Sequence, residues 1–233
     1  MLRYAILDAD CPPGHAARLA DAGVDYLQLR AKSLPIGQLA TLARRLLAET
    51  AHTPTRLLLN ARADVALATQ AHGVHLTSHP NELTPAQIRQ LFHQKQTHAP
   101  QGSCHLDRSQ TASPFGAAEG PPHFARTGNI SARTPAPSPC STSLSCHTLA
   151  DIDRAHALAP DLILFGPIFE KRVPATPQQA EFVQPGIGLA ALEAAVRAAR
   201  GIPVLALGGI TDRNTHACLE AGAAGIAAIR LFA

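Results

Sequence analysis

The sequence predicts an α/β protein, and within that class a single (β/α)8 barrel of the TIM type. Short apolar runs that suit strands alternate along the chain with segments of helical periodicity, and the expected strands number eight. A Gly208-Gly209 turn follows the seventh of these strands, where barrels of this type often bind phosphate. The chain of 233 residues is 46% hydrophobic, which suits one large core. No GxGxxG motif occurs, and this favours the barrel over an open doubly wound sheet.

The eight expected strands are short and mostly apolar on both faces, as in parallel sheets that helices cover. They are residues 3–7, 24–30, 56–60, 73–76, 144–146, 162–165, 203–207 and 225–229.

Seven helices are expected between and after these strands, from their apolar periodicity and their end signals. They are residues 12–22, 35–51, 63–70, 84–92, 148–158, 188–199 and 211–220. Thr84, Thr148 and Thr211 are candidate N-caps, and Gly23 and Gly222 are stop signals. Little sequence follows the last strand, so we expect no full eighth helix. Apolar surface beside the first and last strands would then be exposed unless helix 211–220 or self-association covers it.

Residues 95–143 interrupt the pattern. Seven of the nineteen prolines lie between Pro100 and Pro139, among Ser, Thr, Gly and His. Such a composition buries too little apolar surface to offset the entropy of ordering. We expect a disordered insertion within one domain that spans residues 1–233, looped out between the fourth helix and the fifth strand. Its histidines match no metal-ligand spacing.

Composition excludes several classes of function. The net charge of +3 is too small to indicate a nucleic-acid or membrane partner. No apolar run reaches the length of a membrane span, and the first residues do not have a signal-peptide layout. Five scattered cysteines without a CxxC motif indicate free thiols. We therefore expect a cytoplasmic protein.

The Gly208-Gly209 turn carries the first hypothesis about chemistry. Glycine lets backbone N–H groups approach an anion, and the helix that begins near Thr211 adds positive potential. The alternative is that the two glycines only form a tight turn.

Seven segments, in order along the chain, resemble the thiamine phosphate synthase and TenI superfamily of (β/α)8 barrels. They are QLRAK at 28–32, NARADVA at 60–66, GVHL at 73–76, SCH at 145–147, FGPIF at 165–169, PGIGL at 185–189 and LALGGIT at 205–211. The resemblance covers nearly the whole chain except the insertion.

The resemblance implies roles for particular residues. Gln28, Arg30, Lys32, Asn60 and Gly186 would bind substrate, with a solvated rim of cations as the alternative for the QLRAK segment.

Gly208, Gly209 and Ile229 would bind a phosphate. Arg230 stands where the family has a small serine and would either bind the phosphate or point to solvent. His147 follows a strand, where barrels place catalytic groups, and its usual pKa suits proton transfer near neutral pH. It is the candidate general acid/base, by similarity to the TenI type.

Three other residues have more ordinary expected roles. Cys146 is expected to pack in the core, because neighbours on a strand point to opposite faces. His75 is expected to be a buried, hydrogen-bonded histidine, and His79 a residue of the rim.

The sequence departs from the synthase pattern at its metal ligands. Synthases of this family use Mg²⁺ held by two aspartates, and the matching positions here are Ala61 and Pro80. Mg²⁺ prefers carboxylate oxygens, so we expect no metal site.

The first expectation for function is therefore a TenI-like thiazole tautomerase, a metal-independent proton shift on a small phosphorylated thiazole. One alternative is thiamine phosphate synthase itself, with Mg²⁺ and release of pyrophosphate. Another is a non-catalytic binder of thiamine phosphates or a regulator.

Overall fold

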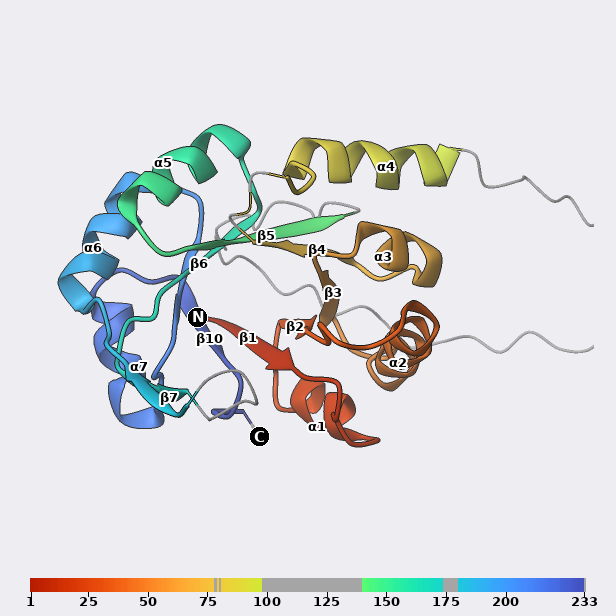
Figure 1. The fold of residues 1–233 in the computed structure, drawn as a ribbon, viewed down its shortest axis with the longest axis horizontal. Helices are drawn as coiled ribbons and strands as arrows, with labels where there is room; N and C mark the ends of the chain where they lie inside the picture. Colours follow the sequence, from red (N-terminus) through yellow and green to blue (C-terminus); the bar gives the residue numbers. More distant parts are fainter. Residues whose placement is uncertain (78, 80, 98–139, 174–179, 233) are drawn as a thin grey trace, which may run out of the picture.

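The computed structural model describes residues 1–77, 79, 81–97, 140–173 and 180–232. Eight parallel strands close into a barrel in the order β1-β10-β9-β6-β5-β4-β3-β2 (Figure 1). They are β1 (Leu2–Leu7), β2 (Tyr26–Leu29), β3 (Arg56–Asn60), β4 (Gly73–Leu76), β5 (Ser141–Cys146), β6 (Leu162–Phe165), β9 (Val204–Leu207) and β10 (Gly225–Ala228). The predicted (β/α)8 barrel is confirmed.

Seven helices are present in the described part of the chain, and in Figure 1 they lie around the outside of the strands. They are α1 (His15–Asp21), α2 (Ile36–Glu49), α3 (Ala63–Thr69), α4 (Pro85–Thr97), α5 (Leu149–Leu158), α6 (Leu189–Ala198) and α7 (Asp212–Glu220). The capping predictions for Thr148 and Thr211 hold, because each forms a reciprocal capping box with the third helical residue.

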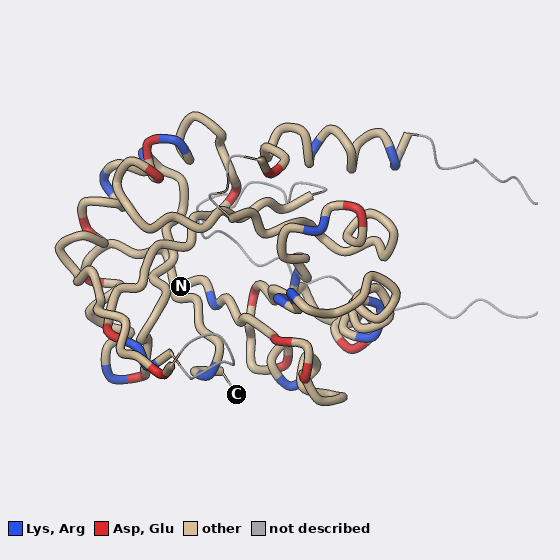
Figure 2. The backbone as a smooth tube through the Cα atoms, viewed as in Figure 1, with Lys and Arg blue, Asp and Glu red and all other residues tan. Residues whose placement is uncertain are grey.

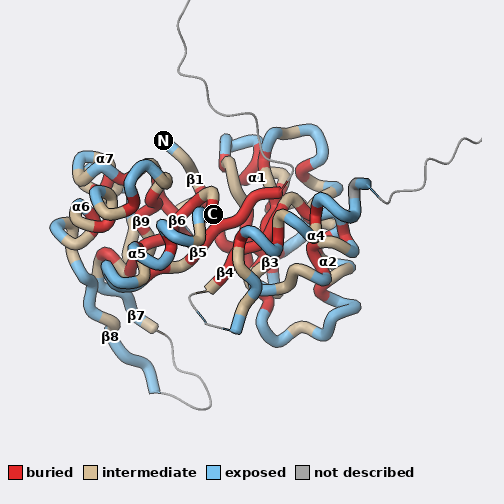
Figure 3. Tube along the Cα trace, turned by 90° about the horizontal axis from the view of Figure 1, so that it is seen from above, coloured by how far each residue is buried: buried red, intermediate tan, exposed pale blue. Residues whose placement is uncertain are grey.

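Two hydrophobic cores result from the alternation of side chains along the strands. The larger one lies between the strands and the helices and includes Leu27, Leu29, Leu57 and Leu59. The smaller one includes Tyr4, Ile6, Leu164 and Leu205, which fill the inside of the barrel. Figure 3 shows buried strands surrounded by half-buried and exposed helices.

The borders of the predicted insertion need correction. Helix α4 continues to Thr97, and strand β5 begins at Ser141, three residues before the predicted start. Alternate serines of β5 face inward, so this strand lacks the apolar run used for the prediction. The predicted disorder otherwise lies outside the described residues.

Helix α4 is attached to the barrel although residues 98–139 separate it from β5. Arg89 of α4 donates to the hydroxyl oxygen of Thr142 at 3.2 Å and to the carbonyl of Ala159. The carboxylate of Asp161 accepts two bonds from Thr142, each of 2.7 Å, and lies 3.6 Å from Arg89. This cluster joins α4, β5 and the segment before β6.

A short antiparallel hairpin lies in the stretch 170–185, where no regular structure was predicted. Its strands are β7 (Lys171–Val173) and β8 (Phe182–Gln184), and residues 174–179 between them are not described. The hairpin projects from the end of the barrel (Figure 3). Three-residue strands are too short to give a clear alternation in the sequence.

The surface beside β1 and β10 is covered differently from the expectation. Leu231 and Phe232 pack against the outer core, and the Arg3 guanidinium lies 4.9 Å from the centre of the Phe232 ring. Ile229 remains about half exposed. The last few residues thus cover part of the space that an eighth helix occupies in an ideal barrel.

Charged residues of both signs are interspersed over the helices and loops (Figure 2). Among the described helices, none combines the length and apolar character that crossing a bilayer requires.

Candidate active site

The predicted binding residues gather at the carboxyl ends of the strands. Gln28 lies on β2 and Asn60 ends β3, while Arg30 and Lys32 directly follow β2. All strands of the barrel are parallel, so these ends form one rim, the rim that carries the active site in enzymes of this fold.

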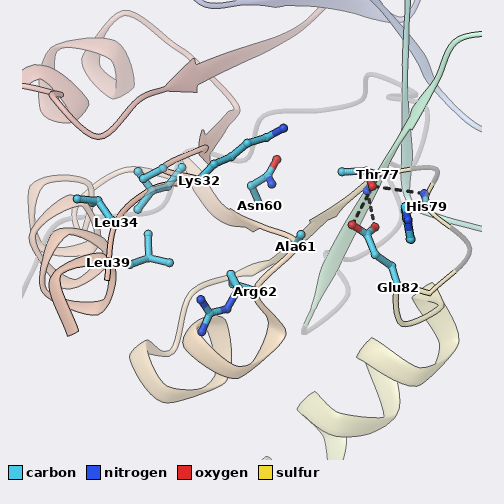
Figure 4. A pocket seen from close by; sticks show the side chains of 11 residues that line it. Lys32, Leu34, Leu39, Asn60, Ala61, Arg62, Thr77, His79 and Glu82 are labelled. Carbon is cyan, nitrogen blue, oxygen red and sulfur yellow. Dashed lines mark hydrogen bonds between the residues drawn. The ribbon is translucent and has the colours of Figure 1, made fainter. Parts of the chain in front are cut away.

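A pocket of about 350 Å³ opens at the ends of β2, β3 and β4 (Figure 4). Leu29, Leu34 and Leu39 form its apolar part, and its polar lining includes the following residues: Lys32, Asn60, Arg62, Thr77, His79 and Glu82. In Figure 4, Lys32 and Asn60 extend to the same side, whereas Arg62 turns away from them. Arg62 forms a bidentate pair with Asp64, at 2.6 and 2.9 Å. Lys32 is therefore the cation that faces a ligand here.

A second pocket of about 280 Å³ shares Lys32 with the first and is also lined by Arg30, Asp8 and Asp10. Arg30 is half-buried, and its side chain has no hydrogen bond or ion pair with another described residue. Partial burial and the charge of Arg30 lower the pKa of Lys171 on β7. Arg30 and Lys32 thus bring positive charge to one part of the rim, beside the carboxylates of Asp8 and Asp10.

Below the rim, a set of polar side chains forms a hydrogen-bonded chain inside the barrel. The Tyr4 hydroxyl donates to Oε1 of Gln28 at 3.2 Å, and Nε2 of Gln28 donates to Oδ1 of Asn60 at 2.8 Å. On the other side, the Tyr4 hydroxyl is 3.0 Å from the hydroxyl of Ser143, which is 2.8 Å from Nδ1 of His75.

His75 is buried, as predicted, and has partners on both ring nitrogens. Its Nε2 atom is 3.0 Å from the Ser145 hydroxyl. Burial, and secondarily the charge of Arg30, lower the pKa of His75 to about 3, so the ring is neutral at pH 7. Burial raises the pKa of Tyr4 well above its usual value. Tyr4, Ser143 and Ser145 were not predicted as site residues, although polar residues at every second position of β5 are a signal of an inward polar face.

His147 follows β5 and is exposed, with its ring held by one hydrogen bond. Its Nδ1 atom lies 2.6 Å from the carbonyl oxygen of Gly166. A carbonyl only accepts, so Nδ1 carries the proton and Nε2 of the neutral ring keeps its lone pair. The backbone N–H of His147 donates to Asp151, which fixes the start of the loop. This arrangement suits a general base. The neighbouring Cys146 is buried and burial raises the pKa of its thiol to about 12, in agreement with packing.

The Gly208-Gly209 turn is needed for packing as well as for any anion. Both residues have positive φ, and a Cβ on Gly209 would lie 2.6 Å from the carbonyl oxygen of Glu170. A Cβ on Gly208 would lie 2.6 Å from Cβ of Pro167. The two glycines therefore do form a tight turn that no larger residue would fit. In this turn the backbone N–H groups of both glycines have no acceptor among the described residues, so they are available to an anion.

The other predicted residues of this side lie around the same loop. Gly186 packs against it, because a Cβ there would lie 2.4 Å from the carbonyl oxygen of Ile168. Ile229 and Arg230 follow β10 and are exposed, and the Arg230 side chain forms no hydrogen bond or ion pair within the described residues. The structure places Gly209 and Arg230 after neighbouring strands β9 and β10, as a phosphate site would require.

The residues at the family's metal positions do not fit a metal ion. Ala61 presents a methyl group, and Pro80 lies outside the described residues. Glu82 supplies the carboxylate of the larger pocket, but its two oxygens accept bonds of 2.6 and 2.8 Å from Thr77. Among the described residues, no group of three or more His, Cys, Asp or Glu side chains could hold a metal. We therefore assign no step of a reaction to a metal held by this chain.

Comparisons with known proteins agree with this fold. Residues 4–98 and 131–232 match a family model described as thiamine monophosphate synthase. A putative thiamine-phosphate synthase of Geobacter sulfurreducens is 33% identical over 208 residues, which are 89% of this chain and 72% of that protein.

Two further similarities come from archaea. A thiamine-phosphate synthase of Methanoculleus marisnigri is 31% identical, over 91% of this chain and 76% of that one. The solved structure of a thiamine phosphate pyrophosphorylase from Pyrococcus furiosus has a TM-score of 0.63 at 22% identity, over 98% of this chain and 85% of that one, and supports the fold alone. By the family match and the identity to these relatives, the chain belongs to the thiamine monophosphate synthase family.

Proposed function

We propose that this protein is a thiamine-phosphate synthase, which joins hydroxymethylpyrimidine diphosphate to thiazole phosphate and releases pyrophosphate. The observation that carries the proposal is the presence of two separate candidate anion sites on one rim. A condensation of two phosphorylated substrates needs a site for a diphosphate and a site for a phosphate. The tautomerase substrate carries a carboxylate and a phosphate, and a group of three cations suits the higher charge of a diphosphate better than a single carboxylate. The names of the relatives also favour the synthase over the tautomerase that the sequence analysis placed first.

The first anion site consists of the cations Arg30, Lys32 and Lys171. A diphosphate leaves more easily when its growing negative charge is neutralised. Burial, and secondarily the charge of Arg30, lower the pKa of Lys171, so the two cations repel each other. An anion between them would relieve this repulsion. We propose that these three cations neutralise the charge of the leaving diphosphate. In the family this is a role of the metal, one of whose aspartate ligands is replaced by Ala61 here.

The second anion site consists of the backbone N–H groups of Gly208 and Gly209, with Ile229 and Arg230 after the adjacent strand. The capping box of α7 holds this turn, because Asn214 donates to the carbonyl of Gly209 at 2.9 Å. A phosphate at a helix N-terminus gains from both the N–H groups and the helix dipole. We assign the phosphate of the thiazole to this site.

In the proposed reaction, the thiazole nitrogen attacks the methylene carbon of the pyrimidine. The bond between that carbon and the diphosphate oxygen breaks, and the electron pair leaves with pyrophosphate. Asn60, held in place by the buried Gln28, orients the pyrimidine substrate. The cations bind the diphosphate, and Gly186 keeps the loop 166–170 in place beside the thiazole site.

A paired assay on one purified sample tests this proposal. One reaction contains the two synthase substrates with Mg²⁺ in solution and is followed by pyrophosphate release. The other contains the thiazole carboxylate phosphate tautomer with EDTA and is followed by isomerisation. Release of pyrophosphate supports the synthase. Binding of both ligands without turnover would instead favour a non-catalytic binder.

Substitutions in β7 sharpen the test. We expect Lys171→Met to lower kcat/KM for the diphosphate substrate roughly tenfold to a hundredfold, since a charge-assisted contact is lost. Arg172→Met is the matched control, because Arg172 is the next residue of the strand and pairs with Glu181 at 3.6 Å on the exposed hairpin. Equal effects of the two substitutions would contradict the assignment of Lys171.

The second candidate function is the metal-independent thiazole tautomerase, and the geometry of His147 favours it. With the proton on Nδ1, its Nε2 atom can remove a proton from carbon and return it elsewhere. If this is the reaction, His147→Gln should lower the isomerisation rate by about 10² to 10⁴. In the synthase, the same substitution should have a much smaller effect on pyrophosphate release.

A further inference from the structure

The polar chain inside the barrel has a direction, which can be worked out from one end. The amide of Gln28 is oriented so that Oε1 accepts from Tyr4 and Nε2 donates to Asn60. The single hydroxyl proton of Tyr4 is therefore used toward Gln28. The Tyr4 oxygen is then an acceptor, for the Ser143 hydroxyl at 3.0 Å and, at the longer distance of 3.4 Å, for Nδ1 of His75.

The same reasoning extends to the histidine. The Ser143 proton points to Tyr4, so the 2.8 Å contact between Ser143 and Nδ1 of His75 needs a proton on Nδ1. A neutral imidazole has one N–H, so Nε2 is an acceptor and takes the proton of the Ser145 hydroxyl at 3.0 Å. With the Gln28 amide in this orientation, any other placement of the protons on Tyr4, Ser143 and His75 leaves one of these hydrogen-bond contacts without a proton.

The hydrogen-bonded chain of side chains ends at the larger pocket. The Oδ1 atom of Asn60 is occupied by Gln28, which leaves the Nδ2 group, with two N–H donors and no acceptor among the described residues. If every bond of the chain were reversed, Nδ2 would face Gln28 and the pocket would receive a carbonyl oxygen. The tautomer of His75 and the polarity of Asn60 are thus linked through Ser143, Tyr4 and Gln28.

We propose that His75 is a positioning residue whose Nδ1–H tautomer holds the Asn60 amide with its N–H donors toward the pocket. The ligand group beside Asn60 is then a hydrogen-bond acceptor, such as a phosphate oxygen or a ring nitrogen, next to the Lys32 cation. The consequence for catalysis rests on the proposed function, whereas the hydrogen-bond direction does not.

Two features keep this chain in one state. Tyr4, Gln28, His75 and Ser143 are each at most 5% exposed, so water does not compete for their hydrogen bonds. Burial, and secondarily the charge of Arg30, keep His75 neutral, so that Nε2 remains an acceptor. A break anywhere between His75 and Gln28 should release the Asn60 amide to rotate.

The first experiment is ¹⁵N NMR of the ligand-free protein with ¹⁵N-labelled histidine, and the His75 signals are identified by their loss in His75→Gln. We expect a protonated Nδ1 and an unprotonated Nε2 from pH 5 to pH 8. A protonated Nε2 with an unprotonated Nδ1 would overturn the proposal. This readout does not depend on which reaction the enzyme catalyses.

The second experiment breaks the chain at one position. Ser143→Ala should mix the tautomers of His75 and speed hydrogen exchange of the Gln28 side-chain amide roughly tenfold, the effect of losing one buried hydrogen bond. Ser141→Ala is the matched control, because Ser141 is two residues earlier on β5, faces the same way and lies outside the chain. If both variants keep the wild-type tautomer and exchange rate, the proposal fails.

An activity measurement connects the chain to function. In the synthase assay, Ser143→Ala should raise KM for the pyrimidine diphosphate roughly twofold to tenfold while the affinity for thiazole phosphate stays unchanged. An unchanged KM together with mixed tautomers would overturn the link to Asn60. If the wild-type protein turns over neither substrate set, the proposed function fails, and the NMR results alone decide the hydrogen-bond direction.

Discussion

Folding stability should depend on pH through the buried His75. Its pKa is about 3 in the folded protein, whereas an unfolded histidine has a pKa of about 6.5. As the pH falls below about 6.5, the unfolded chain takes up a proton that the folded protein refuses. The free energy of unfolding is therefore unaffected by this group above pH 6.5 and decreases as the pH falls toward 3.

The size of the effect follows from the two pKa values. Each pH unit within the window costs about 1.4 kcal/mol, and integration from pH 7 to pH 5 gives about 2 kcal/mol. This is a large part of the stability of a typical domain, which is about 5–15 kcal/mol.

Urea unfolding of the wild type and of His75→Gln at pH 7, 6 and 5 measures this effect. Other groups that titrate, including the half-buried His72, are present in both proteins, so the difference between the two unfolding free energies isolates His75. We expect this difference to change by about 2 kcal/mol in favour of His75→Gln between pH 7 and pH 5. Substitution of the exposed His52 by Gln controls for the loss of a histidine and should leave the wild-type pH dependence in place. Parallel curves for the wild type and His75→Gln would refute the assignment of a neutral, buried ring.

Three further substitutions test other parts of the structure. Asp161→Ala removes two hydrogen bonds of 2.7 Å from Thr142 at a half-exposed site. We expect the free energy of unfolding in urea to fall by about 2 kcal/mol. A decrease below about 0.5 kcal/mol would contradict the role of this carboxylate in attaching α4. Ala61 has φ of 54°, so Ala61→Gly should raise stability by about 0.5–1 kcal/mol in thermal unfolding, and a decrease would contradict the strain assigned to this position. Gly209→Ala places a Cβ 2.6 Å from the carbonyl oxygen of Glu170 and should cost at least about 2 kcal/mol. It should also abolish the stabilisation by added inorganic phosphate, and wild-type values in both measurements would argue against a phosphate at this turn.

Much of the barrel could be predicted from local patterns. The segments 56–60, 73–76 and 162–165 are short apolar runs between turn signals, and the structure has strands at these positions. Such runs are reliable because a parallel strand is buried on both faces and tolerates few polar residues. Strand β5 is the exception, since its serines face a polar interior and hide its first residues from this criterion.

The predicted site residues lie on one rim of the barrel, and other residues near that rim were not predicted. Strand ends marked the positions of Gln28 and Asn60, because all the carboxyl ends of a parallel barrel lie on one rim. Their predicted roles in binding remain proposals. Lys171 was not among the predicted site residues, because its position on the rim depends on the hairpin β7–β8, which has no clear pattern in the sequence.

By itself, the sequence determined the repeating strand and helix pattern and the absence of carboxylates at the family's two metal positions. These properties depend on residue type and on spacing within a segment. Only the tertiary structure decided that Tyr4, Gln28, His75 and Ser143 form one hydrogen-bonded chain. Tyr4 and Ser143 are 139 residues apart in the sequence and meet because the barrel closes on itself, which no local pattern encodes.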